Sequence, residues 1–365
     1  MIITETEIYK YSIPMVPFTI ATGTMYYAQN IFIRIHTNEG ITGVGECSAF
    51  PMIVGETQAT CFEMAKDFAT IWKNKNPLDI EARMKELHLY TAGNYTAKSA
   101  FDLALYDIAA QFANLPLYQY LGGAIKEIES DLTIGISTPE IMAATAIEFK
   151  EKGVHKIKVK LGNRPQEDKE RIRQIRKAIG YDIKLRIDAN QGWSYEDAVS
   201  AITQLAEYDI EFCEQPMRRW NDELLPQLCK LSSIPIMADE SVFTHHDAER
   251  IIRNQACDYI NIKFAKSGGI LEAGLINQVA EQHQIPCMMG GMLESRIALT
   301  AKAHFAMATE NIRFYDLDTC LLGHKVDPVL GGVSFQEMKL LLTDTPGIGA
   351  DVDPDYLKKL VQIVI

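Results

Sequence analysis

The sequence lacks the features that mark exported, membrane-spanning or disulfide-stabilised proteins. No stretch approaches the roughly 18 uninterrupted apolar residues of a membrane helix, and the start MIITETEIY has no basic segment followed by an apolar run. The seven cysteines include no C-x-x-C pair, and an odd, scattered set suits a reducing compartment better than a disulfide framework. These absences predict a cytoplasmic protein that does not act at a membrane.

The chain also lacks a basic tail or an excess of basic residues. Its formal net charge is -12 over 365 residues, which argues against general affinity for nucleic acid or anionic lipid. The composition, 47% hydrophobic and 23% charged, is ordinary for a globular protein, and the length suits one large domain with a smaller one. We therefore expect a globular fold that needs no disulfide.

The first part of the chain combines strand patterns with helix patterns. Residues 1–47 contain apolar runs rich in β-branched residues, with the turn signal Asn38-Glu39-Gly40 between two of them, which predicts an antiparallel sheet. Three later segments carry apolar residues at three- and four-residue spacing and predict helices. These segments are 57–73, 78–90 and 97–112.

After Gly122-Gly123 the pattern changes to short apolar strands separated by amphipathic helices. The strands lie at 132–137, 155–160, 184–190, 210–216, 234–240, 259–265, 285–291 and 312–318. Eight such strands predict a closed α/β barrel, whose active site lies at the C-terminal ends of the strands. An open doubly wound sheet is the alternative, but no G-x-G-x-x-G motif follows any of these strands, so dinucleotide binding has no support.

Charged residues stand at the ends of six of these strands. They are Lys158 and Lys160, Asp188, Glu214, Asp239, Lys263, and Asp316 with Asp318. A single acidic residue at a strand end is most often a helix N-cap or an ion-pair partner. Six charged strand ends in register instead predict one functional site at the mouth of the barrel.

Three carboxylates from adjacent strands, Asp188, Glu214 and Asp239, would repel one another at such a mouth unless a hard cation neutralised them. Oxygen ligands suit Mg²⁺, which keeps positions open for water or a substrate carboxylate. No His or Cys cluster indicates zinc, because His245 and His246 lie at an expected helix start. We expect one Mg²⁺ ion per subunit.

Short motifs mark the ends of successive strands. In chain order they are KVK ending at Lys160, DAN beginning at Asp188, the glutamate Glu214, ADES containing Asp239 and NIKFAKSGG containing Lys263. In this order they match the muconate-lactonizing-enzyme subgroup of the enolase superfamily, and the chain resembles that subgroup over almost its whole length. The mandelate-racemase branch is disfavoured, because Lys263 and Met288-Met289-Gly290 end the strands where that branch has an Asp and a His.

The resemblance implies an α/β fold, a modified TIM barrel of the (β/α)7β type with an N-terminal α+β capping domain. The barrel is expected over residues 126–324. The capping domain is expected over residues 1–125, completed by residues 325–365, with a flexible loop near Pro17 to Thr24. A homo-oligomer is implied by the resemblance alone.

The eighth strand separates the activities of the subgroup. Asp316-Leu317-Asp318 matches the D-x-D motif with which dipeptide epimerases hold the α-ammonium group of the substrate. Charge-assisted hydrogen bonds make this pairing strong, whereas muconate and succinylbenzoate substrates carry no such cation. The alternatives are a cycloisomerase or o-succinylbenzoate synthase, a non-catalytic enolase-like scaffold, and an Asp pair that only caps the next segment.

The resemblance also implies a mechanism. Mg²⁺ binds the substrate carboxylate and stabilises an enediolate, while Lys160 and Lys263 flank the α-carbon and invert it by 1,1-proton transfer. Burial and a nearby cation are expected to lower the pKa of these lysines, whereas Lys158 keeps its charge. Thr133 and Gly291 are further expected substrate-binding residues.

The identity of the dipeptide depends on the cap loop. Epimerases of L-Ala-D/L-Glu, from murein peptide metabolism, can carry an arginine there, but the stretch PFTIATGTMYY has none. A pocket around Ile20, Thr24, Met25, Tyr26 and Met52 would suit an apolar side chain, whereas Arg296 or Lys266 are alternative partners for a glutamate. We expect an L-Ala-Xaa substrate, with Glu slightly favoured over apolar residues.

Overall fold

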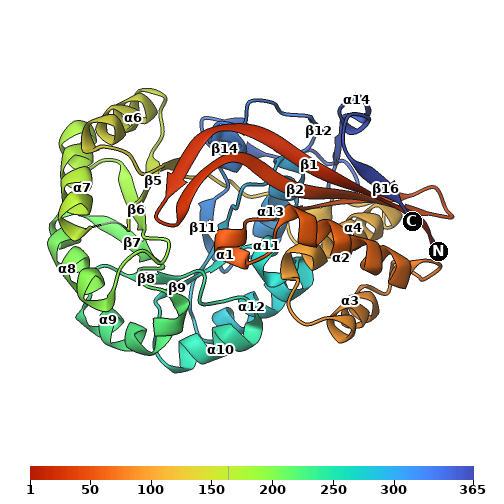
Figure 1. The fold of residues 1–365 in the computed structure, drawn as a ribbon, viewed down its shortest axis with the longest axis horizontal. Helices are drawn as coiled ribbons and strands as arrows, with labels where there is room; N and C mark the ends of the chain where they lie inside the picture. The colour runs from red at the N-terminus through yellow and green to blue at the C-terminus, as the bar shows by residue number, and fades with distance from the viewer. Residues whose placement is uncertain (163) are drawn as a thin grey trace.

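A computed structural model of the chain describes residues 1–162 and 164–365. A four-stranded antiparallel sheet and an eight-stranded parallel sheet form its two main parts (Figure 1). The parallel sheet is bent into a nearly closed barrel with helices outside it, so the expected fold class is confirmed. No helix in these described ranges is long and apolar enough to cross a membrane.

The antiparallel sheet has the strand order β16-β1-β2-β3. Its strands are β1 (Ile3–Ile20), β2 (Gly23–Thr37), β3 (Thr42–Ser48) and β16 (Gln362–Val364). Buried isoleucines recur at alternate positions of β2, at Ile31, Ile33 and Ile35, and this face of the sheet packs on α2 (Gln58–Trp72) and α4 (Tyr95–Phe112). The other helices of this part are α1 (Pro51–Val54), α3 (Ile80–Tyr90) and α5 (Leu117–Tyr120).

The cap loop expected near Pro17 to Thr24 is the end of a long β-hairpin instead. Phe18 pairs with Met25, Thr19 with Thr24 and Ile20 with Gly23, so the strands run directly up to a turn of two residues, Ala21 and Thr22. The hairpin arches over the barrel toward β5 in Figure 1. Local patterns could not show this length, because the cross-strand bonds that extend the hairpin are formed only in three dimensions.

The barrel strands run in sequence order from β4 to β11. They are β4 (Leu132–Ile134), β5 (Lys156–Lys160), β6 (Lys184–Asp188), β7 (Ile210–Glu214), β8 (Ile236–Ala238), β9 (Tyr259–Ile262), β10 (Cys287–Gly290) and β11 (Ile312–Asp316). Helices α6 (Pro139–Glu151), α7 (Pro165–Ile179), α8 (Tyr195–Leu205), α9 (Leu225–Leu231), α10 (His245–Arg253), α11 (Phe264–Ser267), α12 (Ile270–Gln282) and α13 (Arg296–Ala308) connect them.

A few hydrogen bonds join β4 and β11, the two edge strands of the parallel sheet, and close the barrel at this seam. The Asp131 N–H donates to the Tyr315 carbonyl at 3.2 Å, and the Leu317 N–H donates to Ser130 Oγ at 2.7 Å. The Thr133 N–H donates to the side chain of Asp318 at 2.7 Å. The side-chain carboxylate of Asp318 therefore replaces a backbone acceptor at this seam.

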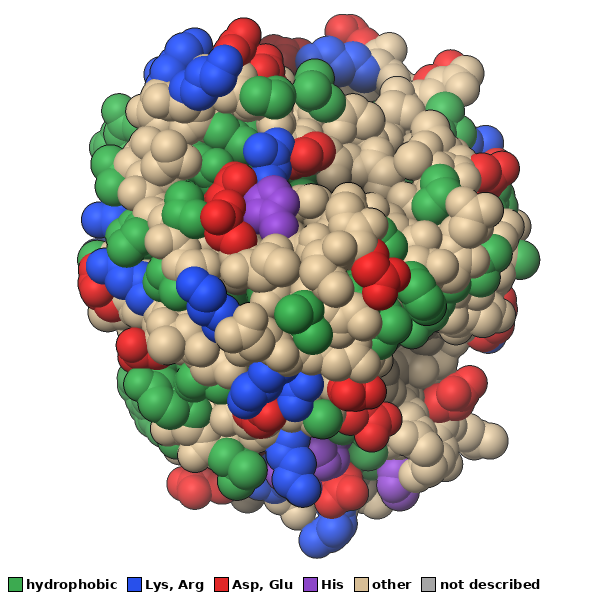
Figure 2. Space-filling view, turned by 90° about the vertical axis from the view of Figure 1, so that its right-hand side faces the viewer, with side chains coloured by type: hydrophobic (Ala, Val, Ile, Leu, Met, Phe, Trp, Pro, Cys, Tyr) green, Lys and Arg blue, Asp and Glu red, His purple; other side chains and the backbone are tan. Residues whose placement is uncertain are grey.

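The chain after β11 returns to the antiparallel sheet. It forms β12 (Val329–Gly331), β13 (Ser334–Gln336), β14 (Lys339–Leu341), β15 (Ala350–Val352), α14 (Pro354–Leu357) and then β16, which pairs with β1. The domain boundaries at residues 125/126 and 324/325 stay a prediction. Acidic and basic side chains are interspersed over the face shown in Figure 2, so neither sign dominates there.

Carboxylates of the cap bind the N-termini of two barrel helices. Glu46 on β3 accepts hydrogen bonds from the backbone N–H groups of Ser295 and Ala298 at the start of α13. Asp102 on α4 likewise accepts from Ile270 at the start of α12. Gly269 allows this approach, because a Cβ there would lie 2.2 Å from the Asp102 carboxylate and its φ is +119°. These contacts position the hairpin over the mouth.

Candidate active site

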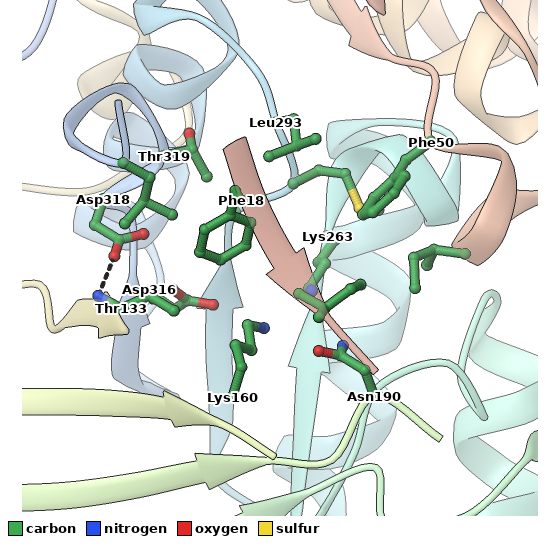
Figure 3. A pocket seen from close by; sticks show the side chains of 15 residues that line it. Phe18, Phe50, Thr133, Lys160, Asn190, Lys263, Leu293, Asp316, Asp318 and Thr319 are labelled. Carbon is green, nitrogen blue, oxygen red and sulfur yellow. Dashed lines mark hydrogen bonds between the residues drawn. The ribbon is translucent and has the colours of Figure 1, made fainter. Parts of the chain in front are cut away.

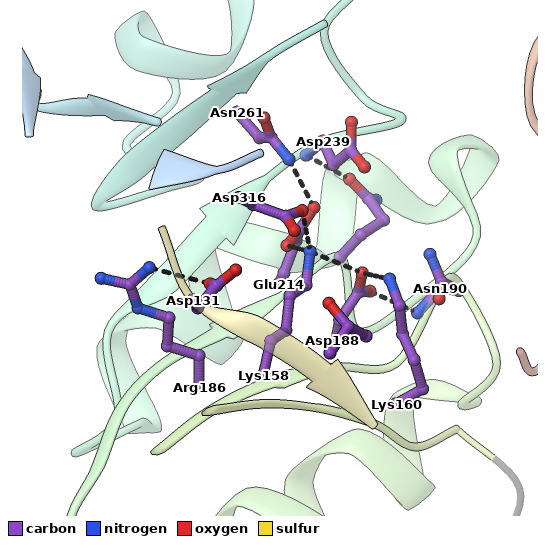
Figure 4. A network of polar contacts seen from close by, with 12 residues as sticks. Asp131, Lys158, Lys160, Arg186, Asp188, Asn190, Glu214, Asp239, Asn261 and Asp316 are labelled. Carbon is purple, nitrogen blue, oxygen red and sulfur yellow. Dashed lines mark hydrogen bonds and ion pairs between the residues drawn. The ribbon is translucent and has the colours of Figure 1, made fainter. Parts of the chain in front are cut away.

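The charged residues expected at the strand ends converge at the mouth of the barrel (Figure 4). Strand β5 shows why. Ile157 and Val159 are fully buried on the outer face toward the helices, so the alternate residues Lys158 and Lys160 face the barrel interior. In register, Lys160 lies beside Asp188, and Asp188 lies beside the end of β7.

Lys158 is fully buried and is shared by three carboxylates. Its Nζ lies 2.6 Å from Glu214, 2.7 Å from Asp316 and 3.3 Å from Asp188. Burial by itself would lower the pKa of Lys158, but the three carboxylates outweigh burial and raise it well above its usual value. The ammonium group therefore keeps its charge, as the sequence indicated.

Lys160 and Lys263 reach the cavity from opposite sides. Their strands, β5 and β9, stand four positions apart in the eight-stranded order. Lys160 Nζ lies 2.6 Å from Asp188, and Lys263 Nζ lies 2.8 Å from Asp239 and 3.9 Å from Glu214. Figure 3 shows both amino groups directed toward the same space.

The pKa of Lys263 differs from the expectation. Burial lowers it, but the carboxylates of Asp239 and Glu214 outweigh burial and raise the pKa above its usual value. The sequence showed that this lysine would be buried, but not that two carboxylates would contact it. Both carboxylates belong to the candidate Mg²⁺ ligands, so a bound cation would compensate the charge that raises this pKa.

The candidate metal ligands Asp188, Glu214 and Asp239 are fully buried at adjacent strand ends. Glu214 Oε2 and both Asp239 oxygens have no hydrogen bond of good geometry within the described residues, although lysines pair with them as ions. Burial and the charge of Asp188 raise the pKa of Glu214 to about 7. Unsatisfied, mutually repelling oxygens of this kind fit a hard cation.

Asp316 and Asp318 line one side of the cavity. Asp318 Oδ2 accepts the Thr133 N–H, whereas Asp318 Oδ1 has no donor in the part of the chain that the structure describes. Thr133 and Gly291 line the cavity as well. A Cβ on Gly291 would lie 2.5 Å from the Thr319 side chain, so a glycine is needed there.

Most of the remaining wall of the cavity is apolar, with Asn190 and Thr319 as its polar members. The cavity has a volume of about 420 Å³, which includes space open to solvent, and its apolar lining consists of Phe18, Ile20, Phe50, Ile53, Met292, Leu293 and Leu322 (Figure 3). Of the five residues expected around a side-chain pocket, only Ile20 lies in this lining. Strand alternation directs Phe18 and Ile20 of β1 to the cavity side, and on β2 it directs Thr24 and Tyr26 to the side opposite Met25, the partner of Phe18.

Neither cation considered as a glutamate partner is available. Arg296 pairs with Asp327 at 2.6 Å and donates to the Val329 and Val333 carbonyls of the C-terminal segment. Lys266 is fully buried and pairs with Asp239 at 2.8 Å. Both cations are thus paired with carboxylates of the protein, so neither is free to pair with a glutamate side chain of a substrate.

Three polar residues of the site were not assigned from the sequence. Asn190 lines the cavity, and Asn261 donates to Glu214 at 2.7 Å. Glu240 is buried, neither of its oxygens has a donor among the described residues, and burial with the charge of Asp239 raises its pKa to about 8. The motifs DAN and ADES contained Asn190 and Glu240, and Asn261 stands two residues before Lys263 on the same strand face.

Comparison with known families decides the relationship. Residues 141–356 match the family model described as enolase C-terminal domain-like, and residues 3–122 match the N-terminal domain of mandelate racemase / muconate lactonizing enzyme. The chain belongs to the enolase superfamily. The resemblance inferred from the strand-end motifs is therefore confirmed.

Similar members of the superfamily are epimerases. The chain is 45% identical to a D-Ala-D/L-Ala epimerase of Cytophaga hutchinsonii over 100% of both chains. It is 42% identical to a hydrophobic dipeptide epimerase of Enterococcus faecalis, over 91% of this chain and 94% of the other. A solved dipeptide epimerase from Cytophaga hutchinsonii, complexed with Mg and the dipeptide D-Ala-L-Val, superposes with a TM-score of 0.98 at 45% identity, covering 100% of both chains. The chain is thus an isomerase of this superfamily.

Proposed function

We propose that the protein is a dipeptide epimerase that inverts the α-carbon of the C-terminal residue of its substrate. The observation that carries the proposal is the shared cavity of two lysines and two aspartates. Lys160 and Lys263 enter it from opposite sides, while Asp316 and Asp318 line a third side. An amino-acid centre held between the lysines would place its neighbouring ammonium group toward the aspartates.

The lysines carry out the proton transfer. One lysine, as a neutral amine, takes the α-proton, and the electron pair of the broken C–H bond moves onto the substrate carboxylate. The other lysine, as an ammonium ion, gives a proton to the opposite face of the same carbon. The configuration inverts, one C–H bond is lost and one is formed, and the two lysines exchange protonation states.

Asp188, Glu214 and Asp239 would hold one Mg²⁺ ion, which when bound supplies positive charge opposite the negative charge that develops on the substrate carboxylate. Lys158 contributes a second, permanent positive charge beneath that position, because three carboxylates keep its ammonium form. The unsatisfied oxygens of Glu214 and Asp239 support this assignment.

The apolar wall supports an apolar second residue. A glutamate side chain there would face Phe18, Ile20 and Phe50, and among the described residues the lysines of the cavity, Lys266 and Arg296 all pair with carboxylates of the protein. A buried carboxylate without a partner is strongly unfavourable. We therefore propose L-Ala-Xaa dipeptides with aliphatic Xaa such as Val as substrates, and place L-Ala-L-Glu second.

Deuterium incorporation from heavy water tests the proposal. Mass spectrometry of an L-Ala-Xaa library should show uptake of one deuterium, strongest for aliphatic Xaa. Lys160→Ala and Lys263→Ala should each abolish epimerisation, and each should keep exchange in only one substrate epimer. Lys156→Ala is the matched control, because this lysine of the same strand pairs with Glu129 outside the cavity and its loss should leave exchange unchanged.

Two results would contradict the proposal. Interconversion of epimers by both alanine variants would exclude the two-lysine mechanism. Turnover of muconate or of the succinylbenzoate precursor, with no deuterium uptake by any dipeptide, would assign the site to the other activities of the subgroup.

A further inference from the structure

A buried guanidinium group, that of Arg186, lies deeper in the barrel than Asp316 and Asp318, the two aspartates at and just after the end of β11. Arg186 on β6 points into the barrel and packs against the neighbouring rings of Phe212 and Phe314, with its guanidinium carbon 5.3 and 5.4 Å from their centroids. Its Nη1 donates to Asp131 at 2.8 Å, and its Nε donates to Glu211 at 2.7 Å. Two carboxylates thus hold this buried guanidinium from two sides.

The Asp131 carboxylate faces the candidate ammonium site from below. Asp131, Asp316 and Asp318 each offer an oxygen that lies within 4.8 Å of the others, and all three residues are buried. Figure 4 shows Asp131 between Arg186 and Asp316. The second oxygen of Asp131 and one oxygen of Asp318 have no hydrogen-bond donor within residues 1–162 and 164–365.

The charges around these three carboxylates do not balance. Glu211 shares Arg186 with Asp131, and Lys158, the lysine at Asp316, is shared with Glu214 and Asp188. Burial, followed by the charge of Asp316, raises the pKa of Asp131 well above its usual value, and an ammonium group bound beside it would lower that pKa and favour the charged carboxylate. A buried group of carboxylates with too few cations attracts a further cation, and an ammonium group that donates hydrogen bonds satisfies their free oxygens.

We propose that Asp131, held by Arg186, is a specificity-determining residue that makes the site select substrates with a free α-ammonium group over N-acylated or deaminated ones. This inference rests on the proposed dipeptide epimerase function and deepens it. Asp131 does not line the cavity, so it acts through its charge behind Asp316 and Asp318. An Asp131 that served only to fix Arg186 would affect all ligands equally.

Two ligands that differ only in the ammonium group separate these roles. L-Ala-L-Val and N-propionyl-L-valine have the same carbon skeleton, and the second lacks the amino group. Dissociation constants of both, measured by calorimetry in one Mg²⁺ buffer, give a preference ratio for each variant. We expect the unaltered protein to prefer the dipeptide and Asp131→Asn to reduce that ratio about tenfold, with the affinity for N-propionyl-L-valine nearly unchanged.

Glu211→Gln is the matched control. It removes the other carboxylate partner of Arg186 but leaves Asp131 in place, so the preference ratio should change less than about twofold. If Asp131→Asn does not fold, the double variant Asp131→Asn with Arg186→Gln leaves no unpaired guanidinium. The preference ratio of the double variant should still fall about threefold, because the negative charge of Asp131 lies nearer to Asp316 and Asp318 than the positive charge of Arg186 does.

The outcomes are distinct. A folded Asp131→Asn protein that binds both ligands equally weakly, or that keeps the full preference, overturns the inference while the proposed function stands. Binding of neither ligand by the unaltered protein overturns the proposed function and this inference with it. A selective loss for the dipeptide supports both.

Discussion

At the scale of single residues, three carboxylates share the ammonium group of Lys158. Glu214, Asp316 and Asp188 come from three different strands, so this one side chain joins the candidate metal ligands to the candidate ammonium site. The contacts give Lys158 a structural role besides its proposed catalytic one. Removing it would leave buried carboxylates without their common counter-ion.

Lys158→Met should therefore destabilise the protein by about 3–5 kcal/mol, the usual cost of breaking a buried ion pair. Denaturant unfolding measures this free energy. Lys156→Met on the same strand removes a partly exposed pair with Glu129 and should cost about 1 kcal/mol or less. Equally small losses in the free energy of unfolding for the two variants would contradict the role of Lys158 as the shared counter-ion of three buried carboxylates.

The second prediction at this scale concerns pH. Burial and the charge of Asp316 raise the pKa of Asp318 to about 7. The other charged groups nearby are Asp131, directly before β4, and Lys158 on β5. Below this pKa Asp318 is neutral and loses its attraction for an ammonium group, so the KM of L-Ala-L-Val should fall as pH rises from about 6 to about 7.5, where the α-amino group of the dipeptide is still mostly protonated.

Initial rates of epimerisation across this pH range measure the effect. Asp318→Asn should raise KM and remove the change near pH 7, since no ionisable group remains at that position. A KM profile that is the same for the variant and the unaltered protein would assign the titration to another group.

At the scale of elements, carboxylates of the cap bind the N-termini of barrel helices. Glu46 on β3 accepts from Ser295 and Ala298 of α13, and the loop just before this helix carries Met292 and Leu293 of the cavity wall. Asn30 on β2 also donates to the Leu293 carbonyl at 3.1 Å. The cap thus shapes the cavity through the barrel loop as well as through its own hairpin.

Glu46→Gln should cost about 1–2 kcal/mol of stability, because it removes a negative charge from a helix N-terminus and weakens buried hydrogen bonds. The loosened loop should raise the KM of L-Ala-L-Val a few-fold, with a smaller change in kcat. Thermal unfolding and steady-state kinetics check both effects. Glu5→Gln, on the exposed face of β1, should change neither quantity.

At the scale of the whole molecule, the barrel gathers more buried carboxylates at one mouth than its lysines neutralise. Asp188, Glu214 and Asp239 repel one another, and the lysines that pair with them are, apart from Lys266, also the proposed catalytic groups. Folding therefore stores electrostatic repulsion at the mouth. A cation that binds only the folded state relieves it.

Removal of metal should accordingly lower thermal stability and abolish activity. Addition of Mg²⁺ at about one hundred times its dissociation constant should raise Tm by about 3 °C or more, whereas NaCl at equal ionic strength should not. Glu214→Gln should reduce the Mg²⁺-dependent shift. Full activity after chelation would contradict the assignment of these three ligands. The cytoplasmic location and the homo-oligomer stay predictions.

The sequence by itself determined the barrel and the residues at its mouth. Period-two apolar strands and the charges at their ends are local patterns, and parallel strands necessarily bring Lys160, Asp188 and Lys263 to one edge. The expected lysines, metal ligands and paired aspartates lie at or directly beneath the cavity, whereas of the five residues expected around a side-chain pocket only Ile20 lines it.

Only the tertiary structure decided which charges are free and which are engaged. The pKa of Lys263 is raised because carboxylates from two other strands contact it, and Arg296 is engaged by the C-terminal segment. The length of the β1–β2 hairpin and the place of Asp131 below the aspartate pair depend likewise on residues far apart in the chain. Such contacts set burial, Coulomb energy and pairing, and no local pattern of the sequence contains them.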